Sequence, residues 1–129
     1  MDLMCVEVQA LHSASSVAGA RERARRFLGS LVPVPAPGAA ESVVLVVSEL
    51  VTNALRHGGG TFTLELTAYT DSVEVAVHDH SPQAPRMRTP DLDDGTGGFG
   101  WPMVNRLART TAVTHRDAGG KTVSALLTR

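Results

Sequence analysis

Hydrophobic and polar residues recur with two different periods along this chain, and the periods predict its elements. In residues 17–31, apolar side chains return at helical spacing with arginines between them, which predicts an amphipathic helix. Residues 39–57 predict a second helix, which contains the apolar run VVLVV. That run by itself is also compatible with a buried strand, because it is rich in β-branched residues. The length of the whole pattern favours the helix.

Shorter segments alternate with a period of two, which is typical of strands with one buried face. They cover residues 4–11, 61–69, 73–77, 110–115 and 122–128. Turn residues between them predict two hairpins, and Pro102 suits the first turn of a third helix at 101–108. Residues 80–100 show no period and are rich in proline and glycine. A loop of this length in a compact domain is usually functional or disordered.

Composition narrows the class of protein. The 129 residues have the length of a single domain, spanning 1–129, and 43% of them are hydrophobic while 19% are charged. With a net charge of -1 and no block of like charge, a disordered tail and direct nucleic-acid binding are not expected. Cys5 is the only cysteine, so an intramolecular disulfide is impossible and a reducing compartment fits best.

The first seven residues contain no basic segment followed by a long apolar core, so a signal peptide is not predicted. No uninterrupted apolar run reaches the roughly 18 residues that a bilayer-spanning helix needs. We therefore expect a soluble, cytoplasmic protein that does not bind membranes.

Three polar residues interrupt the second helix in a regular way. Glu49, Asn53 and His57 stand four residues apart, so they form one ridge beside the apolar face of that helix. A solvated face is the simpler interpretation of such a triplet. The same side chains can also do chemistry, because an amide oxygen is a hard ligand suited to Mg²⁺ and a carboxylate can accept a proton from a nucleophile.

Two further segments contain candidate chemistry. The strand at 73–77 runs into Asp79, whose ionised carboxylate could accept a hydrogen bond from an exocyclic amine such as that of adenine, or could simply start a turn. The glycine-rich residues 95–100 lead directly into the third helix, where free amides favour phosphate. A Walker motif would need Lys and then Ser or Thr after the last glycine, but Trp101 and Pro102 stand there.

Taken in order, the E-x-x-x-N helix, the strand ending in Asp and the glycine-rich lid resemble the GHKL, or Bergerat-fold, ATP-binding superfamily. More narrowly, the segments ARRFLGSL, VVSELVTNALRHG, VAVHDHSP and GFGWPMVNRLA look like small stand-alone bacterial anti-sigma factor serine-protein kinases. The resemblance covers about residues 16–128. It implies an α/β (α+β) two-layer sandwich, with a mixed, mostly antiparallel sheet and about three helices on one face.

The resemblance also implies roles for individual residues. Glu49 would be the general base, Asn53 the Mg²⁺ ligand and Asp79 the residue that reads adenine, while Arg56 and His57 would border the phosphates. The remaining residues implied to contact the nucleotide are Ser81, Gly98, Phe99, Gly100, Trp101 and Thr122. Two positions depart from the pattern, since Ser81 replaces the usual glycine and Trp101-Pro102 replaces a leucine and a small or polar residue.

By this resemblance the protein would transfer the γ-phosphate of Mg-ATP to a Ser or Thr of an anti-sigma antagonist, sequester a sigma factor, or do both. The arginines at 21, 23, 25 and 26 are then a candidate partner surface, although an ordinary exposed basic face is an equal interpretation. A homodimer through the N-terminal strand is a further implication. Two other functions stay open: an ATP-dependent protein-binding module without kinase activity, and a Rossmann-type oxidoreductase, for which the position of the glycines argues poorly.

Overall fold

The computed structural model describes residues 4–8, 15–57, 62–80, 100–116 and 119–129. Its elements follow the order β1, α1, α2, β2, β3, α3, β4 and β5. Their bounds are β1 Met4–Val8, α1 Ser15–Gly29, α2 Pro37–His57, β2 Phe62–Ala68, β3 Ser72–Asp79, α3 Gly100–Leu107, β4 Thr110–His115 and β5 Lys121–Thr128. Every helix and strand expected from the periodicity is therefore present.

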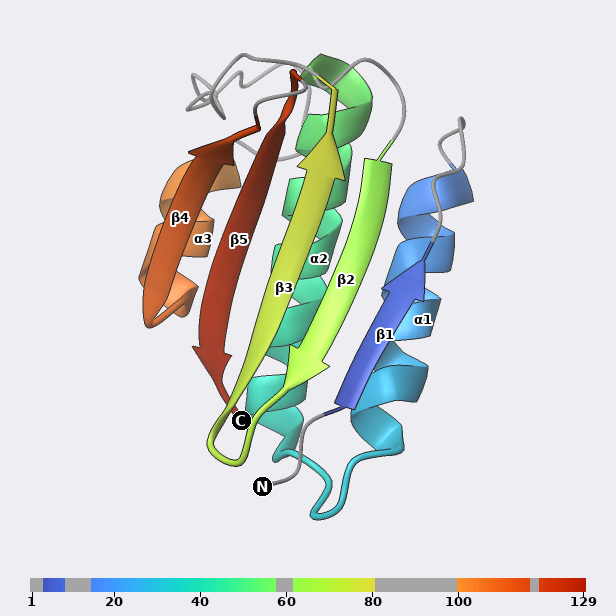
Figure 1. Cartoon of the computed structure of the whole chain (residues 1–129). Helices are drawn as coiled ribbons and strands as arrows, with labels where there is room; N and C mark the ends of the chain where they lie inside the picture. Colours follow the sequence, from blue (N-terminus) through green and yellow to red (C-terminus); the bar gives the residue numbers. More distant parts are fainter. Residues whose placement is uncertain (1–3, 9–14, 58–61, 81–99, 117–118) are drawn as a thin grey trace, which may run out of the picture.

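The five strands form one sheet in the order β1-β2-β3-β5-β4. All four pairings between the described strands are antiparallel, so the mostly antiparallel sheet is confirmed and no parallel pair is found among these strands. The three helices lie behind the sheet in Figure 1 and leave its other face uncovered. This arrangement is the expected two-layer α+β sandwich.

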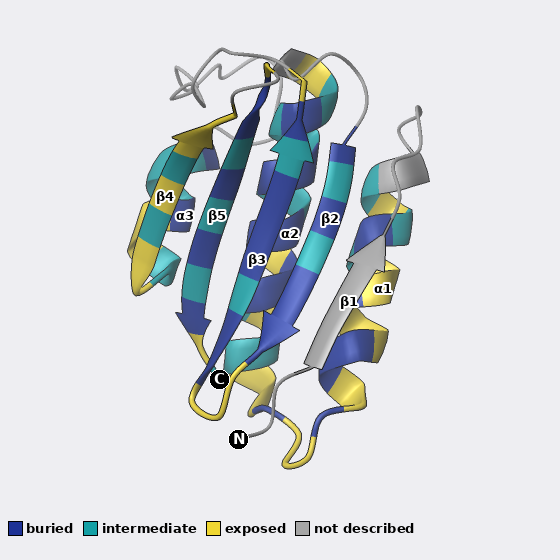
Figure 2. Cartoon of the chain, viewed as in Figure 1, coloured by how far each residue is buried: buried dark blue, intermediate teal, exposed yellow. Residues whose placement is uncertain are grey.

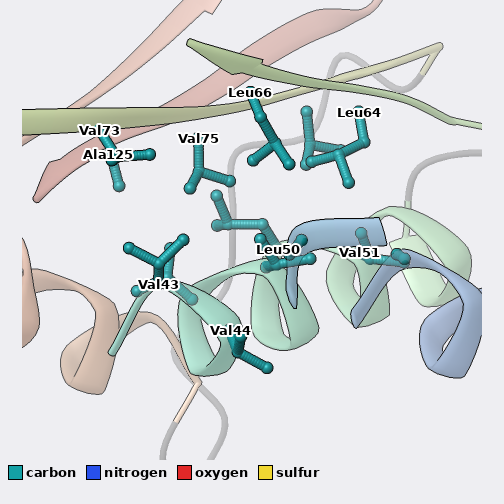
Figure 3. Packing of buried hydrophobic residues seen from close by; sticks show 14 of the residues in the cluster. Val43, Val44, Leu50, Val51, Leu64, Leu66, Val73, Val75 and Ala125 are labelled. Atoms are coloured by element: carbon teal, nitrogen blue, oxygen red, sulfur yellow. The ribbon is translucent and has the colours of Figure 1, made fainter. Parts of the chain in front are cut away.

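Helix α2 is the centre of the core because one side of it is apolar along its whole length. Leu50 and Val51 of this helix point toward Leu64 and Leu66 of β2 (Figure 3). All four side chains are buried, with at most 2% of their surface exposed. By length and composition alone, Pro37–Arg56 is apolar enough to cross a membrane. Packed against the sheet, however, this segment is the core helix of the domain.

Burial alternates along β5, as a sheet with one covered face requires. In β5, positions 121, 123, 125 and 127 are buried while their neighbours 122, 124 and 126 are partly exposed (Figure 2). The buried set faces the helices, because Val123, Ala125 and Leu127 belong to the core. The partly exposed set therefore lies on the uncovered face.

Element bounds differ from the expected ones by a few residues, and proline chemistry explains the clearest case. The pattern predicts that the second helix begins at residue 39, but Pro37 and Gly38 already form the first turn of α2. Proline fits there because the first helical amides have no partner inside the helix. Similarly, β3 continues to Asp79 and β5 begins at Lys121, since these two residues pair with each other across the sheet.

Candidate functional site

The described candidates on α2, β3 and β5 lie toward one end of the domain because of the direction in which each element runs. Strand β3 ends at Asp79, and its antiparallel neighbour β5 begins at the opposite residue, Lys121. The last turns of α2 and these two strand ends lie at the same end of the molecule, at the top of Figure 1. Helix α3, which begins at Gly100, packs against α2.

The second half of α2 carries four of the candidates, Glu49, Asn53, Arg56 and His57. Glu49 and Asn53 are half-buried, and Arg56 is exposed one turn further on. Residues separated by four positions share one helix face, so Glu49 and Asn53 form the described part of the expected ridge, beside the buried Leu50.

The local environment changes the acidity of Glu49. Partial burial raises the pKa of its carboxyl above the ordinary value of 4.5, because a carboxylate loses hydration there. The positive charge of Arg56 lowers the pKa in the opposite direction, but this effect is the smaller one. A carboxylate with a raised pKa is a better proton acceptor, so this environment suits a general base.

Asp79 is buried and its charge is balanced by a residue that the sequence patterns did not single out. The Nζ atom of Lys121 lies 2.9 Å from one carboxylate oxygen of Asp79 and 3.2 Å from the other. The side chain of Lys121 is 4% exposed and that of Asp79 is 3% exposed. A lysine this deeply buried is uncommon unless it is paired. The signal that would have found it is the strand register, which places Lys121 opposite Asp79.

Thr122, which the resemblance implies to contact the nucleotide, lies on the other face of the sheet from Asp79. Its hydroxyl is 2.7 Å from Nδ1 of His78, the residue opposite it on β3. Because neighbouring residues of a strand point to opposite faces, Thr122 points away from Asp79 and Lys121. The structure therefore does not bring Thr122 together with the other candidates, and on β5 it is Lys121 that accompanies Asp79.

The start of α3 is described from Gly100 onward. Gly100 is buried with a φ of 30°, and the partly buried Trp101 packs against the core. Pro102 stands in the first turn, where no amide hydrogen is needed. His57 is the last residue of α2. Ser81, Gly98 and Phe99 lie outside the described residues.

The donor set suits a metal that shares its ligands with a substrate. Within the described ranges, no group of three His, Cys, Asp or Glu side chains could hold a metal ion. Mg²⁺ commonly takes only one or two protein oxygens and completes its shell with water and phosphate oxygens. The amide oxygen of Asn53, on the same helix face as Glu49, fits that requirement.

Part of the positive charge of the arginine-rich helix α1 is paired with a glutamate of the same helix. Glu22 lies 3.9 Å from Arg25 and 3.6 Å from Arg26, and all three side chains are more than half exposed. Exposed pairs of this kind contribute little to stability, but they do neutralise part of the positive charge. Arg23 is also exposed, so a basic surface remains on this helix.

Comparison with known proteins gives two findings. The model of the histidine kinase-like ATPase domain matches residues 11–126 of the chain. Among solved structures, the chain is similar to the crystal structure of the RsbU and RsbW domains of Rv1364c from Mycobacterium tuberculosis, with a TM-score of 0.70 and 18% sequence identity. That match covers 98% of this chain but only 33% of the other, and at this identity it shows the fold alone. A search of curated proteins gives no match.

Proposed function

The chain belongs to the histidine kinase-like ATPase domain family, and from that premise we propose that it binds ATP with Mg²⁺ and phosphorylates a serine or threonine of a partner protein. The observation that carries the proposal is the half-buried Glu49, whose raised pKa suits a base, on one helix face with Asn53. In the proposed site, the carboxylate of Asp79 accepts a hydrogen bond from the exocyclic amine of adenine.

The proposed transfer needs one proton acceptor and a fixed arrangement of charges. Glu49 takes the proton of the partner's hydroxyl group, whose oxygen forms a bond to the γ-phosphorus while the bond from that phosphorus to the β,γ-bridging oxygen breaks, and ADP leaves. Asn53 would hold Mg²⁺, which when bound neutralises charge on the phosphates. Arg56, one turn beyond Asn53, adds positive charge at the same end of α2.

The class of partner is part of the proposal. The motifs VVSELVTNALRHG and GFGWPMVNRLA resemble anti-sigma factor kinases, and a solved structure of the same fold contains a domain that its description calls RsbW. We therefore propose an anti-sigma antagonist as the phosphate acceptor and a sigma factor as a second partner, with the exposed arginines of α1 as the contact surface. Cytoplasmic location and a homodimer belong to the same proposal.

Two measurements on the purified chain test this function. Calorimetry with ATP and Mg²⁺ is expected to show binding, and incubation with γ-labelled ATP and candidate antagonists from the gene neighbourhood is expected to label a Ser or Thr. Glu49→Gln should reduce the labelling rate by about 100-fold or more while nucleotide binding persists, because only the proton acceptor is lost. Glu41→Gln is the matched control, since Glu41 is exposed near the other end of the same helix.

The outcomes separate the two functional classes. Label that disappears with Glu49→Gln but not with Glu41→Gln supports the kinase. Binding without label on any candidate supports the alternative, a protein-binding module that is controlled by ATP and transfers nothing. A folded sample that binds no adenine nucleotide contradicts both.

A further inference from the structure

The buried Lys121 changes which hydrogen-bonding groups a purine base would meet at Asp79. An aspartate alone presents only acceptors, whereas the ammonium group 2.9 Å away presents only donors. Asp79 and Lys121 stand side by side on the helix-facing side of β3 and β5, two residues from the core side chains Val77 and Val123. The ion pair therefore places donor and acceptor atoms at the same spot.

This combination matters for the choice of nucleotide. The 6-amino group of adenine is a donor, and the 6-oxo group of guanine or hypoxanthine is an acceptor. Beside a lone carboxylate, the 6-oxo oxygen of such a base would face another acceptor and would lack a donor. With an ammonium group beside the carboxylate, the 6-oxo oxygen can accept from Lys121 while the N1–H group of the same base donates to Asp79.

Backbone geometry holds Lys121 in this position. Gly120 has a φ of 85°, and a Cβ atom at that residue would collide with the carbonyl oxygen of Asp79. Strand β5 therefore begins in direct contact with the end of β3, and only glycine permits the approach. Because Lys121 follows in the chain, its backbone cannot move away from Asp79 without breaking the strand pairing.

We propose that Lys121 is a specificity-determining residue of the nucleotide site, which lets the protein accept 6-oxo purine triphosphates as well as ATP. The proposal rests on the proposed function, since it presupposes that a base binds at Asp79. The competing interpretation is a purely structural ion pair that closes the ends of β3 and β5. If the ion pair is purely structural, substitution of Lys121 should not change the relative affinity for the two kinds of purine triphosphate.

The test compares ATP with inosine triphosphate, which differs from ATP only at the 6-position and the N1 proton of the base. Calorimetry in the presence of Mg²⁺ is expected to give dissociation constants within about tenfold of each other for the unaltered protein. Lys121→Met removes the donor, so the preference for ATP should increase by about tenfold or more. Lys121→Arg keeps a donor and should stay close to the unaltered protein.

Ser124→Ala is the matched control, because Ser124 stands on the same strand but on the uncovered face. A preference for ATP above about tenfold in the unaltered protein overturns the proposal, and this measurement needs no variant to fold. A smaller increase than tenfold in Lys121→Met, or an equal increase in Ser124→Ala, overturns it as well. Failure of both nucleotides to bind would instead refute the proposed function, and this inference with it.

Discussion

At Glu49, partial burial has two opposite effects. The loss of hydration makes the carboxylate a stronger base, and the same loss makes its ionisation unfavourable for folding. Functional groups often carry such a cost, because their pKa values are shifted by the environment that prepares them for chemistry.

We predict that Glu49→Gln stabilises the protein at neutral pH. Since burial raises the pKa of Glu49 in the folded state, the folded protein holds the proton more tightly than the unfolded chain. The free energy of unfolding therefore decreases as the pH rises from 4.5 through the raised pKa, and the penalty persists above it. Because half of the side chain remains in water, the gain for Glu49→Gln should be below about 1 kcal/mol at pH 7.

The measurement is urea unfolding of the unaltered protein and Glu49→Gln at pH 7 and near pH 4. The difference between the two proteins should be present at pH 7 and shrink toward pH 4, where Glu49 is mostly protonated in both states. A difference that is independent of pH would contradict the explanation, because removing a group that does not titrate in this window would give the same result.

Arg56 should have the opposite influence on the same carboxyl. Its charge lowers the pKa of Glu49, so Arg56→Gln is expected to raise that pKa further. An NMR titration of the Glu49 side-chain carboxyl measures this directly. Arg23→Gln, at an exposed position of α1, serves as the control. An unchanged titration in Arg56→Gln would show that the charge of Arg56 does not affect the Glu49 carboxyl.

Among the elements, α2 has two tasks on two faces. One face fills the core, and the ridge beside it holds the candidate chemistry on a helix fixed by that packing. A loss of packing on the first face should therefore affect the second. Leu45 stands on the same helix with 42% of its surface exposed, which provides an internal comparison for the buried Leu50.

We predict that Leu50→Ala destabilises the protein by about 2–5 kcal/mol, because it removes buried apolar surface and leaves a cavity. Leu45→Ala should cost about 0.5 kcal/mol or less. Chemical denaturation measures both values. Equal costs for the two variants would mean that the apolar face of α2 has been assigned to the wrong side of the helix.

The β4–β5 connection allows a similar comparison at the strand ends. Gly119 and Gly120 both have positive φ values, 91° and 85°, but a Cβ atom has open space only at Gly119. Gly120→Ala should therefore cost about 1–3 kcal/mol more than Gly119→Ala, since it adds a collision with the carbonyl of Asp79 to the same backbone strain. Thermal unfolding of both variants tests this, and equal losses would contradict the close approach.

Periodicity was sufficient to predict the helices and strands, because each element has one covered face. The helix at 39–57 and the ridge of Glu49 and Asn53 follow directly from that rule. The pairing of Lys121 with Asp79 could not be predicted in the same way. It depends on the register between β3 and β5, which 41 residues of intervening sequence leave undetermined: β3 ends at position 79 and β5 begins at 121. The same register separates Thr122 from the site.

For the whole molecule, the main feature is its asymmetry. Helices cover one face of the sheet (Figure 1), and Asp79 and Lys121 stand on that side where β3 ends and β5 begins. A ligand held by Asn53 and Asp79, as proposed, would contact α2 and β3 together. Its binding should therefore oppose unfolding of the entire domain and not of one element only.

We predict that ATP with Mg²⁺ raises the free energy of unfolding by about 2.7 kcal/mol at a ligand concentration 100 times the dissociation constant. Asn53→Ala should remove the part of this gain that depends on Mg²⁺, because it deletes the proposed metal ligand. Thermal unfolding with ATP, with and without Mg²⁺, measures both contributions. If the stabilisation of Asn53→Ala by ATP still depends fully on Mg²⁺, the metal must be bound by other ligands.

The last residue, Arg129, is tied to the opposite end of the domain. Its guanidinium donates hydrogen bonds of 2.9 Å each to the carbonyl oxygens of Tyr69 and Pro33. Strand β5 separates this point from Lys121 by eight residues, or about 25 Å. A peptide tag for immobilisation on a sensor chip, joined after Arg129 by a short linker, would thus leave the end that carries Asp79 and Lys121 facing the solution.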